Sequence, residues 1–272
     1  MKIHQIKIDF NVTEEIKRFV YVYLIEESCC YLIDSGVYGA EERIEAYMKG
    51  IGREVSEIKG IFLTHAHPDH IGTAAFFREK TGCKIYASEG EKPWIEDIDL
   101  QFRERPIPNF YKLAGRSVTV DVTVKDGDIF ELEPGLAIEC IRTAGHSADG
   151  MSYCVSSFMF IGDAVPVKND IPIFINERAQ RETLDLLEKI KGIEAFCPAW
   201  DKTYDAVLMK NRLNEARELI DTLKAAVVRR DDGCPLQELA LRVCESLQMP
   251  QLMGNPLFAG TIDCLRGEEG LR

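Results

Sequence analysis

Three histidines and an aspartate within six residues constrain this chain of 272 residues more than any other feature. They lie in the stretch HAHPDH, residues 65–70, directly after the apolar segment 58–64. Side chains two residues apart on an extended segment point the same way, so His65 and His67 share one side. Asp69 and His70 then open the following helix. Imidazole and carboxylate groups are ligands for zinc, iron or manganese, so the sequence predicts a metal site at this strand end.

Two later apolar segments end in residues of the same chemical kind. His146 follows the predicted strand 136–142, and Asp163 follows the predicted strand 158–161. A glycine precedes each of them, Gly145 and Gly162, and lets another part of the backbone approach closely. Either residue alone is a weak signal, since an aspartate after a strand is often a turn residue. Together with HAHPDH they favour a metal site, and a relic site that binds nothing is the alternative.

The rest of the pattern predicts an α/β domain over residues 1–204 and a helical appendage over residues 205–272. Alternating or continuous apolar runs predict strands, and i, i+3, i+4 spacing predicts helices. The strands are expected at 3–9, 19–25, 31–33, 58–64, 84–87, 117–124, 129–132, 136–142, 151–155, 158–161 and 195–197. Helices are expected at 41–49, at 71–80, around Leu184–Ile190, and as three apolar stripes after residue 205.

One segment, residues 91–116, interrupts this pattern. It carries three prolines, the pair Arg103 and Arg105, and several aromatic residues including Trp94. We expect an irregular or partly helical insertion that forms part of a pocket wall or lid, because long loops in compact domains are often functional. The alternative is an outer helix that packs Trp94 onto the core.

Composition narrows the classes of partner. The net charge is −12 and no basic stripe is present, which argues against a nucleic-acid-binding protein. No apolar run approaches the ~20 residues of a membrane helix, and residues 1–10 lack the apolar core of a signal peptide. The nine cysteines show no CxxC spacing, which is typical of a reducing compartment. We therefore expect a cytoplasmic protein that acts on a small molecule and binds neither nucleic acid nor membrane.

The stretches HAHPDH, TAGHS (143–147) and IGDA (161–164), in that order and spacing, resemble the metallo-β-lactamase superfamily. The resemblance covers roughly residues 1–204. It implies an αβ/βα four-layer sandwich, with two mixed sheets face to face, helices outside and the metal site at one edge. It also implies a first metal site of His65, His67 and His146, and a second of Asp69, His70 and the bridging Asp163.

The chain departs from the family at one position. Trp200 stands where the family usually supplies a last histidine ligand, and tryptophan cannot ligate because its indole nitrogen is only a donor. Asp201 or a water molecule could take that place, whereas Cys197 is expected in a strand core and His4 in a structural role. We expect one or two divalent ions, zinc first, with iron or manganese as alternatives, and a second site weaker than the first.

The resemblance implies a hydrolase that uses a metal-activated hydroxide on a small ester, thioester or lactone, as in glyoxalase II-like members. Asp69 would accept a hydrogen bond from the nucleophile and act as base. One alternative is a mononuclear iron, sulfur-dioxygenase-like oxidoreductase that uses His65, His146 and Asp163. Another is a metal-binding scaffold without activity. The helices after residue 205 are expected to pack on the sandwich or to form a homo-oligomer contact.

Overall fold

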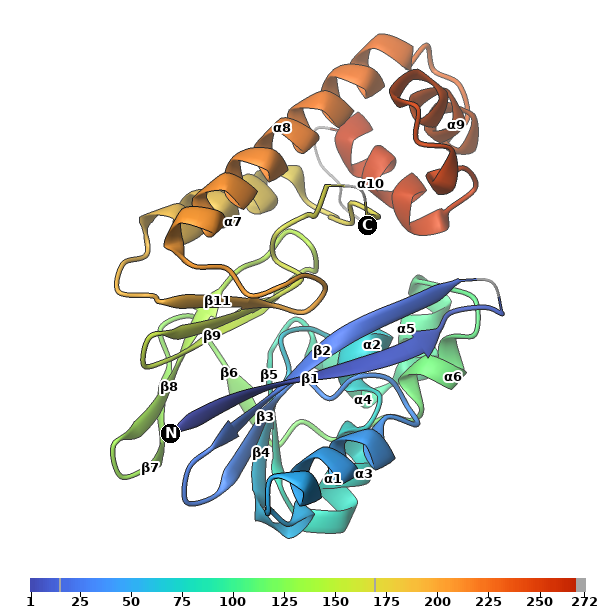
Figure 1. Cartoon of the computed structure of the whole chain (residues 1–272). Coiled ribbons are helices and arrows are strands. Elements are labelled where there is room, and N and C mark those ends of the chain that lie inside the picture. The colour runs from blue at the N-terminus through green and yellow to red at the C-terminus, as the bar shows by residue number, and fades with distance from the viewer. Residues whose placement is uncertain (15, 169, 268–272) are drawn as a thin grey trace.

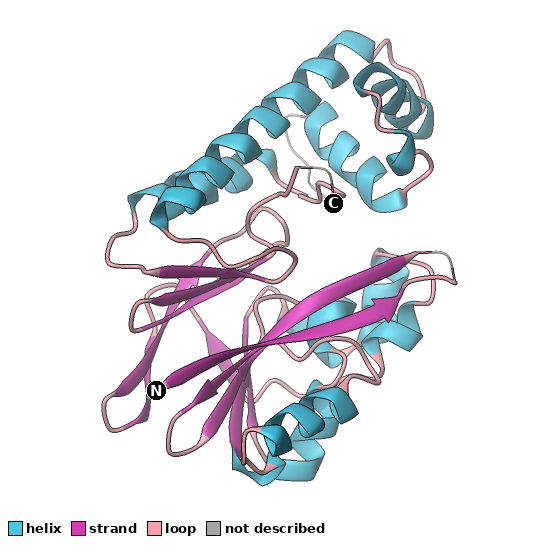
Figure 2. Cartoon of the chain, viewed as in Figure 1, coloured by secondary structure: helices cyan, strands magenta, loops and turns pink. Residues whose placement is uncertain are grey.

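Two mixed β-sheets face each other in the computed structural model, which describes residues 1–14, 16–168 and 170–267 (Figure 2). The first sheet has the strand order β1-β2-β3-β4-β5-β6 and the second the order β11-β10-β9-β8-β7. The first comprises β1 (Lys2–Asn11), β2 (Lys17–Glu26), β3 (Cys30–Ile33), β4 (Ile58–Phe62), β5 (Lys84–Ser88) and β6 (Val122–Val124). The second comprises β7 (Ile129–Glu133), β8 (Leu136–Arg142), β9 (Met151–Val155), β10 (Phe158–Gly162) and β11 (Ala195–Pro198).

Helices cover the outer face of each sheet, so that the molecule has four layers (Figure 1). The first sheet carries α1 (Glu41–Gly50), α2 (Pro68–Ile71), α3 (Ala74–Thr81), α4 (Lys92–Glu96), α5 (Ile98–Glu104) and α6 (Phe110–Ala114). The second carries α7 (Glu177–Lys189) and α8 (Ala206–Arg230), and α9 (Leu236–Leu247) and α10 (Pro256–Arg266) pack against α8 (Figure 1). Short 3-10 turns occupy Val55–Glu57 and Pro250–Leu252. This arrangement confirms the predicted αβ/βα sandwich.

Apolar side chains fill the spaces between the layers. Tyr23 and Phe62 of the first sheet meet Tyr153 and Phe160 of the second in a buried cluster between the two sheets. Alternate side chains of a strand point to opposite faces, so the same strands also line the outer clusters beneath the helices. These clusters hold the carboxyl ends of β4, β8 and β10 against one another at one edge of the sandwich.

Two predicted elements differ in the structure. The helix expected at 71–80 is divided into α2 and α3, with a break at Gly72. A Cβ atom on Gly72 would lie 2.1 Å from the backbone nitrogen of Tyr38, so the preceding loop packs directly on this glycine. The strand expected at 117–124 is paired only at β6, because the amide nitrogens of Val118 and Val120 bond to Ile95 and Glu96 of the insertion instead of to β5.

The C-terminal helices pack onto the sandwich. Met209, Leu213 and Ile220 of α8 are buried in one cluster with Ile161 of β10 and Phe196 of β11. The side chain of Asp205 accepts a hydrogen bond from the Leu208 amide and begins α8. The division into domains at residue 205 stays a prediction, although these helices share their core with the second sheet. None of the described helices is both long and apolar enough to cross a bilayer.

Truncation after residue 204 should therefore leave a protein that does not fold cooperatively. It would uncover the apolar outer face of β10 and β11, and loss of even one buried leucine such as Leu213 costs roughly 2–5 kcal/mol. Soluble yield and the sharpness of urea unfolding would be compared between the full chain and residues 1–204. A truncated chain that stays soluble and unfolds in one sharp transition would contradict this expectation.

Candidate metal centre

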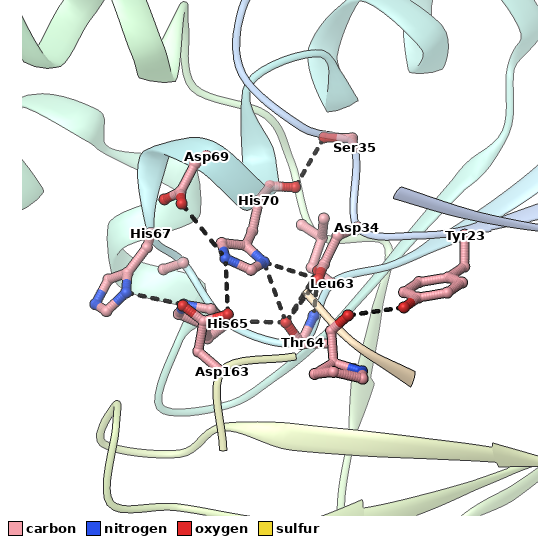
Figure 3. A network of polar contacts seen from close by, with 12 residues as sticks. Tyr23, Asp34, Ser35, Leu63, Thr64, His65, His67, Asp69, His70 and Asp163 are labelled. Carbon is pink, nitrogen blue, oxygen red and sulfur yellow. Dashed lines mark hydrogen bonds and ion pairs between the residues drawn. The ribbon is translucent and has the colours of Figure 1, made fainter. Parts of the chain in front are cut away.

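Three imidazole nitrogens converge at the edge where β4 and β8 end. His65 Nε2 lies 2.8 Å from His67 Nδ1, which lies 2.9 Å from His146 Nε2. The three side chains are buried, and His65 and His67 come from the loop between β4 and α2 (Figure 3). Nitrogens bound to one tetrahedral zinc ion at 2.0–2.1 Å stand roughly 3.3 Å apart, so a small outward shift would accommodate an ion. The structure thus brings together the three residues that the resemblance assigns to the first metal.

Hydrogen bonds to the second nitrogen orient two of these rings. His146 Nδ1 donates to the carbonyl oxygen of Ile173 at 2.9 Å. His65 Nδ1 lies 3.0 Å from Thr64 Oγ1, and that hydroxyl in turn donates to the carboxylate of Asp34. Each of these bonds places the ring proton on Nδ1 and leaves the Nε2 lone pair directed at the convergence point. Such partners fix the tautomer of metal-binding histidines.

A second group forms beside the first around His70. Its Nδ1 donates to Asp34 Oδ2 at 2.8 Å, while its Nε2 lies 3.5 Å from Asp163 Oδ1 (Figure 3). Both His70 Nε2 and Asp163 Oδ1 are buried without a hydrogen-bond partner in the described part of the chain. A metal ion bound between these two atoms would give each of them the partner that it lacks. His65, His70 and Asp163 offer ligand atoms within 4.8 Å of one another.

Asp69 lies beside His70 and Asp163, and its side chain is more exposed than theirs. Its Oδ2 is 3.7 Å from His70 Nε2, and its side chain is 16% exposed. The other ligand-bearing loop is held close by Gly162, which has a φ of +49°. A Cβ atom there would come 2.7 Å from Thr64 Oγ1, so glycine allows the end of β10 to bring Asp163 beside His70.

Burial keeps the first three histidines in their neutral form. Desolvation lowers the pKa of His65 and His67 well below the ordinary range and lowers the pKa of His146 to about 4. Burial also opposes the charged form of His70, but the carboxylates of Asp34, Asp163 and Asp69 outweigh it and raise the pKa of His70. Neutral imidazole is the metal-binding form, so His65, His67 and His146 can bind a cation without first releasing protons, whereas His70 has to lose its extra proton to act as a ligand.

We predict that the free energy of unfolding of the metal-free chain, prepared with a chelator, depends on pH. The unfolded chain protonates His146 near pH 6.5 and the folded chain only near pH 4, so the free energy of unfolding falls as pH decreases across that window. We expect a loss on the order of 3 kcal/mol from His146. Urea unfolding between pH 7 and 4 measures it, and His146→Ala should flatten the slope. If the unfolding free energy of His146→Ala depended on pH as steeply as that of the wild type, His146 would not be the residue that causes the loss.

Trp200 and Asp201 do not join either group of ligands. The Trp200 ring packs against Phe10 and Phe19, with the Arg18 guanidinium 5.8 Å from its centre. The carboxylate of Asp201 accepts hydrogen bonds from the Lys202 amide at 2.7 Å and from the Tyr204 hydroxyl. The expectation that Asp201 replaces the missing histidine therefore finds no support, because its oxygens are already engaged.

Cys197 and His4 lie where the sequence places them. Cys197 is buried between the sheets. His4 contacts Glu26 at 2.8 Å and Tyr47 at 3.2 Å, on the first two strands and α1. Neither residue belongs to the metal centre.

The insertion 91–116 supports the histidine loop through two residues that sequence reasoning did not single out. Glu91 accepts hydrogen bonds from the Ala66 and Asp149 amides at 2.9 and 3.0 Å. Gln101 Nε2 donates to the Ala66 carbonyl at 2.8 Å. Ala66 stands between two of the histidines, so both of its backbone groups are held by this segment. A buried glutamate and a buried glutamine are uncommon, but burial was not visible in the sequence.

Trp94 shows that the insertion also packs on the core. Its ring lies partly buried against the helical cluster of the first sheet, and its Nε1 donates to Glu104 at 2.6 Å. The insertion therefore packs Trp94 onto the core, as the alternative expects, and it also contacts the histidine loop through Glu91 and Gln101. Its role as a pocket wall or lid stays a prediction.

Known proteins with a similar sequence or structure agree with this picture. A probable metallo-hydrolase of Bacillus subtilis, YqgX, is 32% identical over 139 residues, 49% of this chain and 58% of that protein. A probable polyketide biosynthesis zinc-dependent hydrolase of Bacillus velezensis, BaeB, is 32% identical over 40% of each chain. A hydroxyacylglutathione hydrolase of Rhodopseudomonas palustris is 27% identical over 45% of this chain and 41% of that protein. The matches thus span between 40% and 58% of the curated relatives.

Solved structures share the fold over most of the chain. The metallo-beta-lactamase family protein TTHA1429 from Thermus thermophilus aligns with a TM-score of 0.75 at 19% identity, covering 97% of this chain and 91% of that one. The subclass B3 metallo-beta-lactamase BJP-1 of Bradyrhizobium japonicum aligns with a TM-score of 0.63 at 23% identity, covering 76% and 88%. A family model described as the metallo-beta-lactamase superfamily matches residues 16–196. The chain belongs to the metallo-beta-lactamase superfamily.

Proposed function

We propose that this protein is a metal-dependent hydrolase, with zinc as its first metal, that acts on a small ester, thioester or lactone. The convergence of His65, His67 and His146 on one point carries the proposal. The buried orphan pair of His70 and Asp163 beside it adds the ligands for a second ion. The names of the relatives, which include a metallo-hydrolase and hydroxyacylglutathione hydrolases, support the same reaction class.

The residues divide into those that would hold metal and those that would handle protons. The three convergent histidines would hold the first ion, and His70 with Asp163 and Asp69 the second. When bound, a divalent ion supplies a Lewis acid and a coordinated water of pKa near 7. Thr64 and Asp34 keep the Nε2 lone pairs of His65 and His70 directed at the site through the bonds described above.

Asp69 is the candidate for positioning the attacking water. It begins α2 beside the ligands, it lies 3.7 Å from His70 Nε2, and it is the most exposed carboxylate of the group. A carboxylate there accepts a hydrogen bond from the nucleophile, orients it toward the scissile carbonyl and can pass the proton to the leaving group.

Metal analysis combined with activity assays tests the proposal. Elemental analysis of the purified protein should find at least one zinc, iron or manganese ion per chain. Hydrolysis of a panel of small thioesters, esters and lactones should then depend on that metal and be abolished by a chelator. Oxygen uptake with persulfide substrates is measured in parallel, and uptake in place of hydrolysis would favour the iron oxidoreductase. A metal-loaded protein inactive in both assays would favour the scaffold.

Asp69→Asn should separate proton handling from folding. We expect the rate of hydrolysis to fall about 10²- to 10⁴-fold, the usual contribution of a positioned acid–base group. The first metal should stay bound, because its three histidines are untouched. Steady-state kinetics and metal content of the variant measure the two effects. Asp99→Asn, on the neighbouring α5, serves as control, and equal kinetics of the two variants would refute the role.

A further inference from the structure

A buried glutamate lies between the two loops that carry the first group of histidines. Glu91 occupies the N-cap position of α4, but its side chain makes no capping bond there. The usual N-cap residues are serine, threonine, aspartate and asparagine. Glu91 is only 3% exposed, and burying a carboxylate is costly unless its oxygens accept hydrogen bonds. The start of α4 therefore does not account for a glutamate at this position.

The two carboxylate oxygens of Glu91 bind loops that belong to different sheets. Oε2 accepts from the Ala66 amide at 2.9 Å, and Ala66 stands between two histidines in the loop after β4 of the first sheet. Oε1 accepts from the Asp149 amide at 3.0 Å, in the loop between β8 and β9 of the second sheet. His146 lies in that same loop. One carboxylate thus joins both loops that supply the first metal site.

Further contacts hold the turn before α4 against the loop of Asp149. Ser88 Oγ donates to the Asp149 carbonyl at 2.6 Å, and the Gly90 amide donates to Asp149 Oδ2 at 3.0 Å. A Cβ atom on Gly90 would lie 2.5 Å from the Asp149 Cβ, so glycine lets the two segments approach this closely. Arg142 Nε donates to the other Asp149 oxygen at 2.7 Å. These contacts fix the place of Asp149 relative to Glu91.

We propose that Glu91 is a positioning residue that sets the spacing between the loop of residues 65–67 and His146. The ligands of the first metal come from both sheets, and Glu91 is bonded to a backbone amide of each ligand loop. Metal–ligand distances vary by only about 0.2 Å, so a shift of either loop would weaken the site. The inference rests on the metal centre of the proposed function and does not depend on its substrate.

Glu91→Gln tests this role in the full chain loaded with zinc or with cobalt(II). Glutamine has one acceptor oxygen, so its NH2 group would face the second backbone amide and two donors would meet. We expect the affinity for the first metal equivalent to fall about 10- to 100-fold, the usual effect of losing a group that orients metal ligands. The visible absorption of the first cobalt equivalent should change too, because it reports coordination geometry. Competition with a chelator measures the affinity, and absorption spectroscopy measures the geometry.

The fold should survive this substitution, because the Met151 amide still donates to the Thr64 carbonyl at 2.8 Å and joins the start of β9 to the histidine loop. If Glu91→Gln nevertheless fails to fold, Glu91→Asp provides the second variant. Its carboxylate is one methylene too short to reach both amides, so the same losses are expected.

Glu96→Gln is the matched control at the other end of α4. Glu96 Oε1 accepts from the Val120 amide at 2.9 Å, so this variant also loses an acceptor for a backbone amide. The other partner of Glu96 is Lys92, and both partners lie outside the two ligand loops. Its metal affinity and cobalt spectrum should equal those of the wild type.

Wild-type affinity and spectrum in the folded Glu91 variant would overturn the proposal. Equal losses in the Glu91 and Glu96 variants would also overturn it, because the effect would then be a general loosening of the insertion. A wild-type chain that binds neither ion would overturn the metal centre together with this role of Glu91. A wild type that binds metal but hydrolyses none of the substrates refutes only the proposed function, and the metal affinities then decide the role of Glu91.

Discussion

The double variant His65→Ala with His67→Ala should lose its metal and essentially all hydrolytic activity. It removes two of three convergent nitrogens and also takes His65 from the second group. If the ion contributes even about 4 kcal/mol to the transition state, the rate falls about 10³-fold. Stability should change as well, since a ligand at 1,000 times its Kd stabilises the native state by about 4.1 kcal/mol. Metal content, kinetics and thermal unfolding with and without added zinc measure the three effects.

His4→Ala is the matched control for that variant. His4 is the histidine outside the site, and its partners are Glu26 and Tyr47. It should keep a full complement of metal, and zinc should stabilise it as it does the wild type. If the double variant also retained its metal, or if both proteins lost theirs together, the ion would be bound elsewhere.

Asp34→Asn should disturb the second group of ligands through the tautomer of His70. Asp34 has a φ of +58°, a conformation that asparagine tolerates, so the backbone should persist. The amide would keep its oxygen for the Thr64 nitrogen and turn its NH2 group toward His70 Nδ1. The imidazole proton would then move to Nε2, which can no longer ligate. We expect metal affinity at this group to fall about 10- to 100-fold and stability to fall by about 1–3 kcal/mol.

Zinc titration and urea unfolding of Asp34→Asn measure the two changes, and Ser35→Ala serves as control. Ser35 Oγ donates to the backbone carbonyl of His70 at 2.9 Å and does not touch the ring. Its loss should weaken the fold without altering metal affinity. Equal affinity in Asp34→Asn and the wild type would show that His70 does not depend on this carboxylate.

The strands and the three ligand-bearing strand ends could be predicted from the sequence because their signals are local. β4 is buried at every residue except Lys59, and the HAHPDH stretch follows soon after its end at Phe62. In the sequence alone, Asp34 opens the stretch Asp34-Ser35-Gly36, which is typical of a turn after a strand. Its role depends on β3 lying beside β4 in parallel register, with Ile33 opposite Phe62. An aspartate that ends the strand next to the histidine-bearing one is the signal that could have found it.

Tertiary contacts can also override the local pattern. The periodicity of residues 71–80 is helical throughout, but the packing of Tyr38 on Gly72 interrupts it. Asp201 has the chemistry of a ligand and the expected position, yet a tyrosine and an arginine from later in the chain, Tyr204 and Arg212, engage its carboxylate. Which groups engage the Asp201 carboxylate depends on where the side chains lie in the folded chain, and the spacing of residues in the sequence does not define that.

The bond from His146 to Ile173 joins the metal centre to the far end of the chain. The loop that carries Ile173 is fastened to α10, where Thr261 Oγ1 donates to the Pro172 carbonyl at 2.7 Å and accepts from the Phe174 amide. The ring of His146, a candidate ligand, is thus linked to a helix about a hundred residues further along the chain. If the C-terminal helices were exchanged for those of another family member, the new helices would have to supply hydrogen bonds to this loop in place of those from Thr261. The two sheets and the C-terminal helices are therefore expected to be inherited together.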